Sequence, residues 1–198
     1  MNHALLVAPI LIPLCSLLLA IILRRHLLAV RVLSLTGAVL LLAVGLMLVW
    51  QAAQGVVLSG QVGGWQAPFG ISLVIDRLSA VMIAISALVA LVTLLYGVAK
   101  DNDSKIGRDF HLFIQGLLTG ICGAFITADI FNLYVWFEVL LIASFALMAL
   151  GGGSRRLAGS MTYVALNLFA TLIFLLSAGL VYGASGTLNM GCLLYTSL

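Results

Sequence analysis

Glu138 is the residue best placed to do chemistry, because it is the only charged residue in the apolar run Ile130–Leu150. A run of this length can cross a bilayer as one helix. A rise of 1.5 Å per residue puts Glu138 about 12 Å below one end of the span. An acidic residue at that depth costs about 2.5–3.5 kcal/mol on insertion scales, and such residues usually mark ion or proton paths. The sequence therefore predicts a proton-exchanging Glu138, with a protonated residue that only packs helices as the alternative.

Further polar residues in the apolar runs are candidates for a proton path to Glu138: His111, Gln115, Thr119, Tyr134, Tyr163, Asn167 and Thr171. Tyr134 lies one helical turn before Glu138 and could donate a hydrogen bond to it. The others recur at four-residue spacing in two stripes, each on one helix face. Such stripes either bond neighbouring helices, at about 0.6 kcal/mol per bond, or hydrate a path to the carboxylate. His111 is expected at the mouth of its span, where it could load protons or simply lie at the interface.

Other polar residues near the spans have structural interpretations. Asp76 and Asp129 each precede an apolar run and are expected to cap the N-terminus of the helix that follows. For Asp129, a role as a proton acceptor is the alternative. Tyr134 and Trp136 could instead anchor their helix at the membrane interface. A short strand is expected within Gly70–Ile75, after the turn residues of 63–70.

The chain as a whole has the composition of an integral membrane protein, with 64% hydrophobic and only 8% charged residues. Runs without Asp, Glu, Lys or Arg predict six transmembrane helices in an all-α bundle: Ala4–Leu23, Val32–Trp50, Leu78–Ala99, His111–Ala128, Ile130–Leu150 and Met161–Tyr182. Pro9 and Pro13 should bend the first helix. These runs are too long, and alternate too little, for strands of an outer-membrane barrel.

The basic residues predict the orientation of these helices. Eight of the nine fall in alternate connections, and Arg77 alone lies on the other side. The positive-inside rule makes the eight cytoplasmic, so the N-terminus and the connection 51–77 are expected outside. We expect a multi-pass protein of a bacterial or archaeal cell membrane.

Several chemistries are not expected from the motifs. The cysteines Cys15, Cys122 and Cys192 are far apart and form no metal or disulfide pattern. No pair of histidines lies deep in the spans to ligate a haem, and no nucleotide-binding fingerprint is present. Gly183–Gly186 matches a short serine-protease motif, but no histidine follows it. No cofactor and no metal are therefore expected, and the intramembrane Glu138 favours ion or proton transport over an enzyme.

The segment Asp129–Phe145, with Trp136, Glu138 and the pair Ser144-Phe145, resembles the signature of the antiporter-like subunits. These subunits are shared by complex I, membrane-bound hydrogenases and Mrp-type multisubunit cation/proton antiporters. Within that superfamily, the residues of 63–71, 76–80 and 186–190 are similar to the D-type subunits of the Mrp antiporters. The resemblance covers essentially residues 1–190.

This resemblance implies that Glu138 matches the fifth-helix glutamate that is central to proton translocation in the family. There it interacts with a lysine on a seventh helix, within inverted repeats of five helices. The resemblance also implies that the chain is the N-terminal part of a larger subunit. On this basis we expect three segments: 1–110 with helices one to three and the outer loop 51–77, 111–190 with the start of the proton-translocating domain, and 191–198 as a truncation artefact.

Three functions remain open at this point. The chain could belong to a Na⁺(K⁺)/H⁺ antiporter, with Glu138 as its proton site and other subunits as partners. It could instead belong to a homologous proton pump driven by NADH or hydrogen, in which redox chemistry occurs elsewhere. It could also be a non-transporting structural subunit of such an assembly. No nucleic-acid partner is expected.

Overall fold

The computed structural model describes residues 3–62, 70–100 and 105–196. In this part of the chain, seven helices and two strands follow one another: α1 His3–Ile22, α2 Leu27–Ala53, β1 Leu58–Gln61, β2 Ser72–Ile75, α3 Arg77–Lys100, α4 Lys105–Ile126, α5 Ile130–Ala149, α6 Ser154–Ser185 and α7 Met190–Thr196. The first six helices are long and apolar enough to span a membrane. The prediction of six transmembrane helices is confirmed, and Pro9 and Pro13 both lie inside α1.

Three helices begin five or more residues earlier than the apolar runs predict, and α6 is one of them, because it starts at Ser154 rather than Met161. α2 starts at Leu27 rather than Val32 and therefore contains Arg31, and α4 starts at Lys105 rather than His111. An apolar run stops at the first charge, whereas a helix continues through the interface, where long basic side chains extend toward water. Helices α2, α4 and α6 are therefore longer than the apolar runs from which they were predicted.

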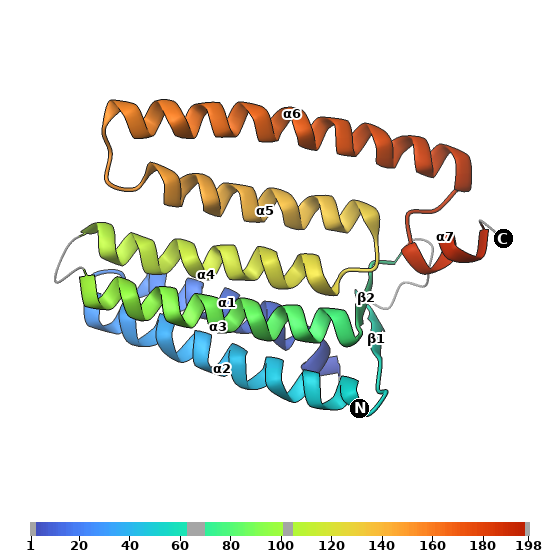
Figure 1. The fold of residues 1–198 in the computed structure, drawn as a ribbon, viewed down its shortest axis with the longest axis horizontal. Helices are drawn as coiled ribbons and strands as arrows, with labels where there is room; N and C mark the ends of the chain where they lie inside the picture. Colours follow the sequence, from blue (N-terminus) through green and yellow to red (C-terminus); the bar gives the residue numbers. More distant parts are fainter. Residues whose placement is uncertain (1–2, 63–69, 101–104, 197–198) are drawn as a thin grey trace.

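The long helices lie side by side and alternate in direction, with α1–α4 in one group and α5 and α6 added on one side of it (Figure 1). α1 packs on α2 and α4, α2 packs on α3, α4 packs on α5, and α5 packs on α6. Small residues allow the closest of these contacts. A Cβ atom at Gly45 of α2 would lie 3.0 Å from the Cα atom of Ala84 in α3, as is typical of helix pairs in membranes.

A small hairpin covers the end of the bundle at which α2 ends and α3 begins (Figure 1). β1 pairs antiparallel with β2, from Leu58 opposite Ile75 to Gln61 opposite Ser72. The strand expected within Gly70–Ile75 is confirmed as β2, whereas β1 has no clear signal in the sequence. The turn residues of 63–69 lie outside the described residues.

The same end of the bundle is tied together by hydrogen bonds between distant segments. Ala128 donates its backbone N–H to Ser72, and Met190 donates its own to Ala128, both at 2.9 Å. The side chain of Asn189 donates to the hydroxyl of Ser72 at 2.8 Å. These hydrogen bonds join the hairpin, the α4–α5 turn and the segment before α7, and they fix the position at which α5 begins.

Candidate functional site

Glu138 lies on the face of α5 that meets α6. Two aromatic contacts mark this face: the Tyr134 ring stacks on Phe174, with centroids 6.5 Å apart, and Phe145 meets Tyr163 edge-on at 5.3 Å. Residues three or four positions apart on a helix share a face. Glu138, four positions after Tyr134 and seven before Phe145, therefore points to the same side as both rings.

The aromatic contacts also fix the level of Glu138 along α6. The two helices run in opposite directions (Figure 1), with Phe174 beside Tyr134 at one level and Tyr163 beside Phe145 at the other. The segment of α6 between these levels lies opposite Glu138. It presents two of the predicted path residues, Asn167, which is half-buried, and Thr171, which is buried. Asn167 and Thr171 therefore lie at about the same level of the bundle as Glu138.

Within the described residues, the Glu138 carboxylate is poorly satisfied. Its Oε1 atom is buried and has no hydrogen-bond partner there, and the predicted bond from Tyr134 is not formed. Asn167 instead donates its side-chain N–H to the Tyr163 carbonyl at 2.8 Å. The hydroxyl of Thr171 donates to the Leu168 carbonyl at 3.1 Å. These donors bond within their own helix, and one rotamer change would free either of them.

The polar stripe of α4 has a different environment. His111, Gln115 and Thr119 are all buried, with exposed fractions of 1%, 0% and 3%. The Nδ1 atom of His111 lies 2.7 Å from the hydroxyl of Ser34, and the Gln115 side chain donates to the Ser34 carbonyl at 2.7 Å. The stripe therefore bonds α4 to α2, which is the helix-bonding alternative. His111 is buried rather than exposed at the end of its helix, because Lys105–Phe110 precede it in α4.

A neighbouring face of α4, which carries Gly116, Gly120 and Gly123, meets α5. A Cβ atom at Gly120 would lie 2.9 Å from the backbone nitrogen of Leu140, and one at Gly123 would overlap the Trp136 ring. Glu138 lies on the far side of α5 from this contact. Among the described residues, the α4 stripe therefore does not reach Glu138. The glycine spacing in α4 was the signal in the sequence that could have predicted this.

Trp136 packs into the bundle rather than anchoring α5 at the interface. Its indole lies against Gly123 and the core cluster of α1–α4. The same side chain lines a cavity of about 450 Å³ together with Leu6 and Ile10 of α1 and Gly60 of β1. The interfacial interpretation of Trp136 is therefore wrong, whereas Tyr134, half-buried against Phe174, faces α6.

The two predicted helix caps are confirmed. Asp129 accepts a hydrogen bond from the backbone N–H of Asn132 at 2.8 Å and caps α5. Asp76 accepts one from the backbone N–H of Ser79 at 2.8 Å, at the start of α3. This bond holds the pKa of the Asp76 carboxyl below its usual value. Both carboxylates therefore have structural roles in this fold.

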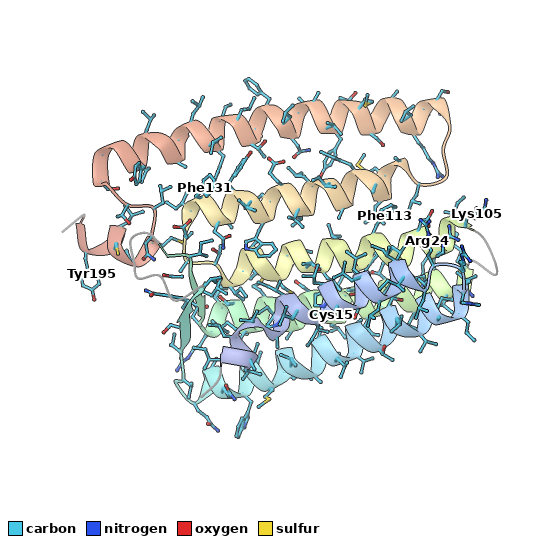
Figure 2. The ribbon with its side chains drawn as sticks, turned by 180° about the vertical axis from the view of Figure 1, so that it is seen from behind. Cys15, Arg24, Lys105, Phe113, Phe131 and Tyr195 are labelled. Atoms are coloured by element: carbon cyan, nitrogen blue, oxygen red, sulfur yellow. The ribbon has the colours of Figure 1, made fainter. Side chains whose placement is uncertain are left out.

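The basic residues gather at the end of the bundle opposite the hairpin, where Figure 2 labels Arg24 and Lys105. Arg108 there forms an ion pair with Asp109 at 3.1 Å. Arg77 lies at the hairpin end and donates to the Ala52 carbonyl. The separation of charge predicted from the connections is therefore present in the fold. In the ranges 3–62, 70–100 and 105–196, no cluster of three or more His, Cys, Asp or Glu side chains could hold a metal ion.

Comparison with known proteins identifies the family. Residues 127–197 match the family model described as NADH:quinone oxidoreductase/Mrp antiporter, TM. The chain is 35% identical to the D subunit of the Na⁺/H⁺ antiporter of Bacillus subtilis over 93% of its own length. It is 38% identical over 96% of its length to the D subunit of the Na⁺/H⁺ antiporter of Alkalihalophilus pseudofirmus. The chain belongs to this family of antiporter-like membrane subunits. It is thus a multi-pass membrane protein, similar within the family to the D-type subunits of Mrp antiporters.

Other relatives of the antiporter-like family extend the comparison. The D subunit of a probable K⁺/H⁺ antiporter of Rhizobium meliloti is 46% identical over 66% of this chain. The fold matches a chain of the Mrp complex from a Dietzia species with a TM-score of 0.86 and 25% identity, over 94% of this chain and 36% of that one. It matches a chain of an archaeal membrane-bound sulfane sulfur reductase equally well, with 29% identity over 93% of this chain and 39% of that one. The chain spans 37% of the length of the Bacillus subtilis protein and 38% of that from Alkalihalophilus pseudofirmus.

Proposed function

We propose that this chain forms part of a membrane subunit that exchanges Na⁺ or K⁺ for H⁺ in a multisubunit antiporter, with Glu138 as the proton site. The observation that carries the proposal is the position of Glu138. Its carboxylate lies in the middle of a transmembrane helix, with a buried oxygen that lacks a partner in the described residues. Burial of the ionised carboxylate is costly at such a position, and ionisable residues within membrane helices usually mark ion or proton paths.

The neighbours of Glu138 support a proton-exchanging role. Asn167 and Thr171 lie at its level on α6 and carry both donors and acceptors, so they can bond to a carboxylate or to a carboxylic acid. Their present bonds are to backbone carbonyls of their own helix. A change of side-chain rotamer would let them follow the protonation state without moving either helix. Proton exchange at Glu138 then needs only local rearrangement.

Two observations bear on the exchanged ions. The relatives from Bacillus subtilis and Alkalihalophilus pseudofirmus are named Na⁺/H⁺ antiporter subunits, and that from Rhizobium meliloti a probable K⁺/H⁺ antiporter subunit. The proposal therefore includes both Na⁺ and K⁺ as the exchanged cation. The equal structural likeness to a respiratory reductase complex favours, as a second candidate, a proton-pumping subunit of a redox-driven assembly. In both candidate functions, the partners of this chain are other membrane subunits.

The test is Glu138→Gln in the subunit that contains this chain, expressed with its partner subunits in antiporter-deficient cells. Gln keeps the size and hydrogen bonding of the side chain but cannot exchange a proton. We expect cation-dependent proton movement in inverted vesicles to fall at least about a hundredfold, the lower range for loss of an acid–base group. Exchange that depends on Na⁺ or K⁺ without a redox substrate distinguishes the antiporter from the redox pump.

Asp129→Asn is the matched control for this test. It also neutralises a buried carboxylate of α5, but Asn caps a helix as well as Asp does, so exchange should stay near the wild-type level. Wild-type exchange by the Glu138→Gln variant would contradict the proton-site role. Loss of exchange together with loss of the assembled complex, measured by co-purification of the partners, would instead favour the structural-subunit alternative.

A further inference from the structure

A cavity of about 550 Å³ opens at the basic end of the bundle, between the end of α3, the start of α4 and the α5–α6 turn. Its lining combines apolar and aromatic side chains with two cations, and the members used below are Tyr96, Lys100, Phe110, Leu147, Leu150 and Arg156. The proton site proposed above is far from it along α5, since Glu138 precedes Leu147 by more than two helical turns. The cavity is therefore a separate feature.

The floor of the cavity is apolar and built by close packing. A Cβ atom at Gly97 would lie 2.8 Å from the Phe110 ring, so the absence of a side chain there lets the ring lie across α3. Phe110 and Leu147 both pack against the buried core of α1–α4. Leu150, at the end of α5, extends this surface toward the rim. Together they offer a surface that suits a hydrocarbon chain.

The rim of the cavity is cationic. Lys100 ends α3, with its ammonium 5.8 Å from the centre of the Tyr96 ring. Arg156, in the first turn of α6, donates one N–H to the Leu150 carbonyl at 2.8 Å, which leaves four N–H donors of its guanidinium for another acceptor. In the described part of the chain, neither cation forms an ion pair with a carboxylate. Both therefore have capacity to bind an anion at the rim.

We propose that this cavity binds one anionic phospholipid. The phosphate lies between Lys100 and Arg156, and an acyl chain runs over Phe110, Leu147 and Leu150. Charge complementarity selects this occupant: basic pockets between transmembrane helices on the cytoplasmic side bind anionic head groups, and tyrosine favours the head-group level. The lipid would join α3 to the α5–α6 turn, two parts of the bundle that otherwise share few contacts.

The experiment is a titration of the purified chain, in non-ionic detergent, with dioleoylphosphatidylglycerol, followed by native mass spectrometry. Dioleoylphosphatidylcholine, with the same acyl chains and no net charge, is the lipid control. We expect one phosphatidylglycerol to bind in preference to phosphatidylcholine. Lys100→Gln and Arg156→Gln should each raise its dissociation constant about fivefold, the usual contribution of one basic residue near a membrane surface.

Arg25→Gln is the matched control variant, because it removes one exposed positive charge from the same end without touching the cavity. Its dissociation constant should change less than twofold. The dissociation constant of Arg156→Lys, which keeps the charge, should also stay within about twofold of the wild-type value. This result would show that the weaker binding of Arg156→Gln is not caused by misfolding. Leu147→Trp, which fills the cavity, should weaken phosphatidylglycerol binding at least fivefold.

Three results would overturn the proposal. The first is equal affinity for the two lipids. The second is an effect of Arg25→Gln as large as that of Lys100→Gln, which would mean that the general field of the basic end attracts the lipid. The third is evidence that no acyl chain is held, seen either as wild-type affinity in Leu147→Trp or as full displacement of the lipid by an excess of inorganic phosphate. None of these depends on transport, so they leave the proposed function untouched.

Discussion

The α4 stripe and the α5–α6 seam are both lines of polar side chains inside an apolar bundle, but they differ in which helices their hydrogen bonds join. Each has one buried side-chain oxygen without a partner in the described residues, Oε1 of Gln115 in the stripe and Oε1 of Glu138 at the seam. In the α4 stripe, Ser34 accepts or shares bonds with both His111 and Gln115, and all three side chains are buried. The first arrangement fixes helices, and the second leaves a titratable group free to change its bonds.

Packing explains why the two regions differ. α4 is covered by α1, α2, α3 and α5, so its polar groups are shielded from water and bond mainly to protein. Oε1 of Gln115 is an exception, because it has no partner among the described residues. α6 packs on α5, and most of its side chains are exposed in the described structure. A polar group at such a seam can exchange partners at small cost. Within this chain, therefore, Gln115 of the α4 stripe bonds to a neighbouring helix, whereas Asn167 and Thr171 of the seam bond within their own helix.

The largest effect on stability should come from filling the glycine face of α4. We expect Gly120→Ala to destabilise the fold by about 2–3 kcal/mol, since its Cβ would lie 2.9 Å from the Leu140 backbone, which cannot move aside as a side chain would. Reversible unfolding in mixed micelles, titrated with denaturing detergent, measures this change.

Gly179→Ala is the control for this substitution, because no atom lies within 4 Å of a Cβ at that position of α6. Ala is the better helix former by about 1 kcal/mol, so this variant should be neutral or more stable. Equal destabilisation by the two substitutions would show that the α4–α5 contact is looser than the structure describes, and would weaken the separation of the α4 stripe from Glu138.

A smaller effect should separate the polar stripes themselves. Gln115→Leu removes the bond to the Ser34 carbonyl and leaves that buried acceptor with one partner fewer, so it should cost about 1–2 kcal/mol. Asn167→Leu loses only a bond within α6 and should stay within about 0.5 kcal/mol of the wild type. The same unfolding assay compares the two, and a reversed order would contradict the distinction between a helix-bonding stripe and an exchangeable seam.

The sequence predicted the elements of this fold better than their contacts. The six spans, the caps at Asp76 and Asp129 and the collection of basic residues at one end follow from local composition, and the structure has them all. Helix ends were displaced because a charge ends an apolar run before it ends a helix. The strand β1 was missed because Leu58–Gln61 is too short and too polar to stand out from a connecting loop.

The contacts of the site depended on which face of each helix meets which neighbour. The four-residue spacing correctly put Gln115 with Thr119, and Asn167 with Thr171, on common faces. The spacing did not predict that the α4 pair faces α2 and the α6 pair faces α5, because it defines which residues of one helix share a face but not which neighbouring helix that face meets. Gly116, Gly120 and Gly123 carried that information for α4, since a row of small residues marks the closest helix contact.

The smallest expected effect is that of replacing Asp76, a carboxylate at the hairpin end of the bundle. It provides a comparison with Glu138, the carboxylate in the middle of α5. The pKa of Asp76 lies below its usual value because the Ser79 N–H donates to it, although burial acts weakly in the other direction. A carboxyl whose pKa falls on folding contributes stability above its unfolded value, near 4, and loses it as the pH drops through the folded value. The wild-type chain should therefore lose some stability below about pH 4 that the Asp76→Asn variant does not lose.

Above pH 6, Asp76→Asn should change stability by only a few tenths of a kcal/mol, because Asn also accepts the cap bond, and cation–proton exchange should be unchanged. Unfolding in detergent between pH 3 and 8 (roughly the range that spans carboxyl titration) and vesicle assays of the assembled complex measure the two quantities. A shift in the pH profile of exchange in this variant would place Asp76 on the proton path. If the pH profile of exchange is unchanged in Asp76→Asn but exchange is lost in Glu138→Gln, then of these two carboxylates only Glu138, at the α5–α6 seam, takes part in proton exchange.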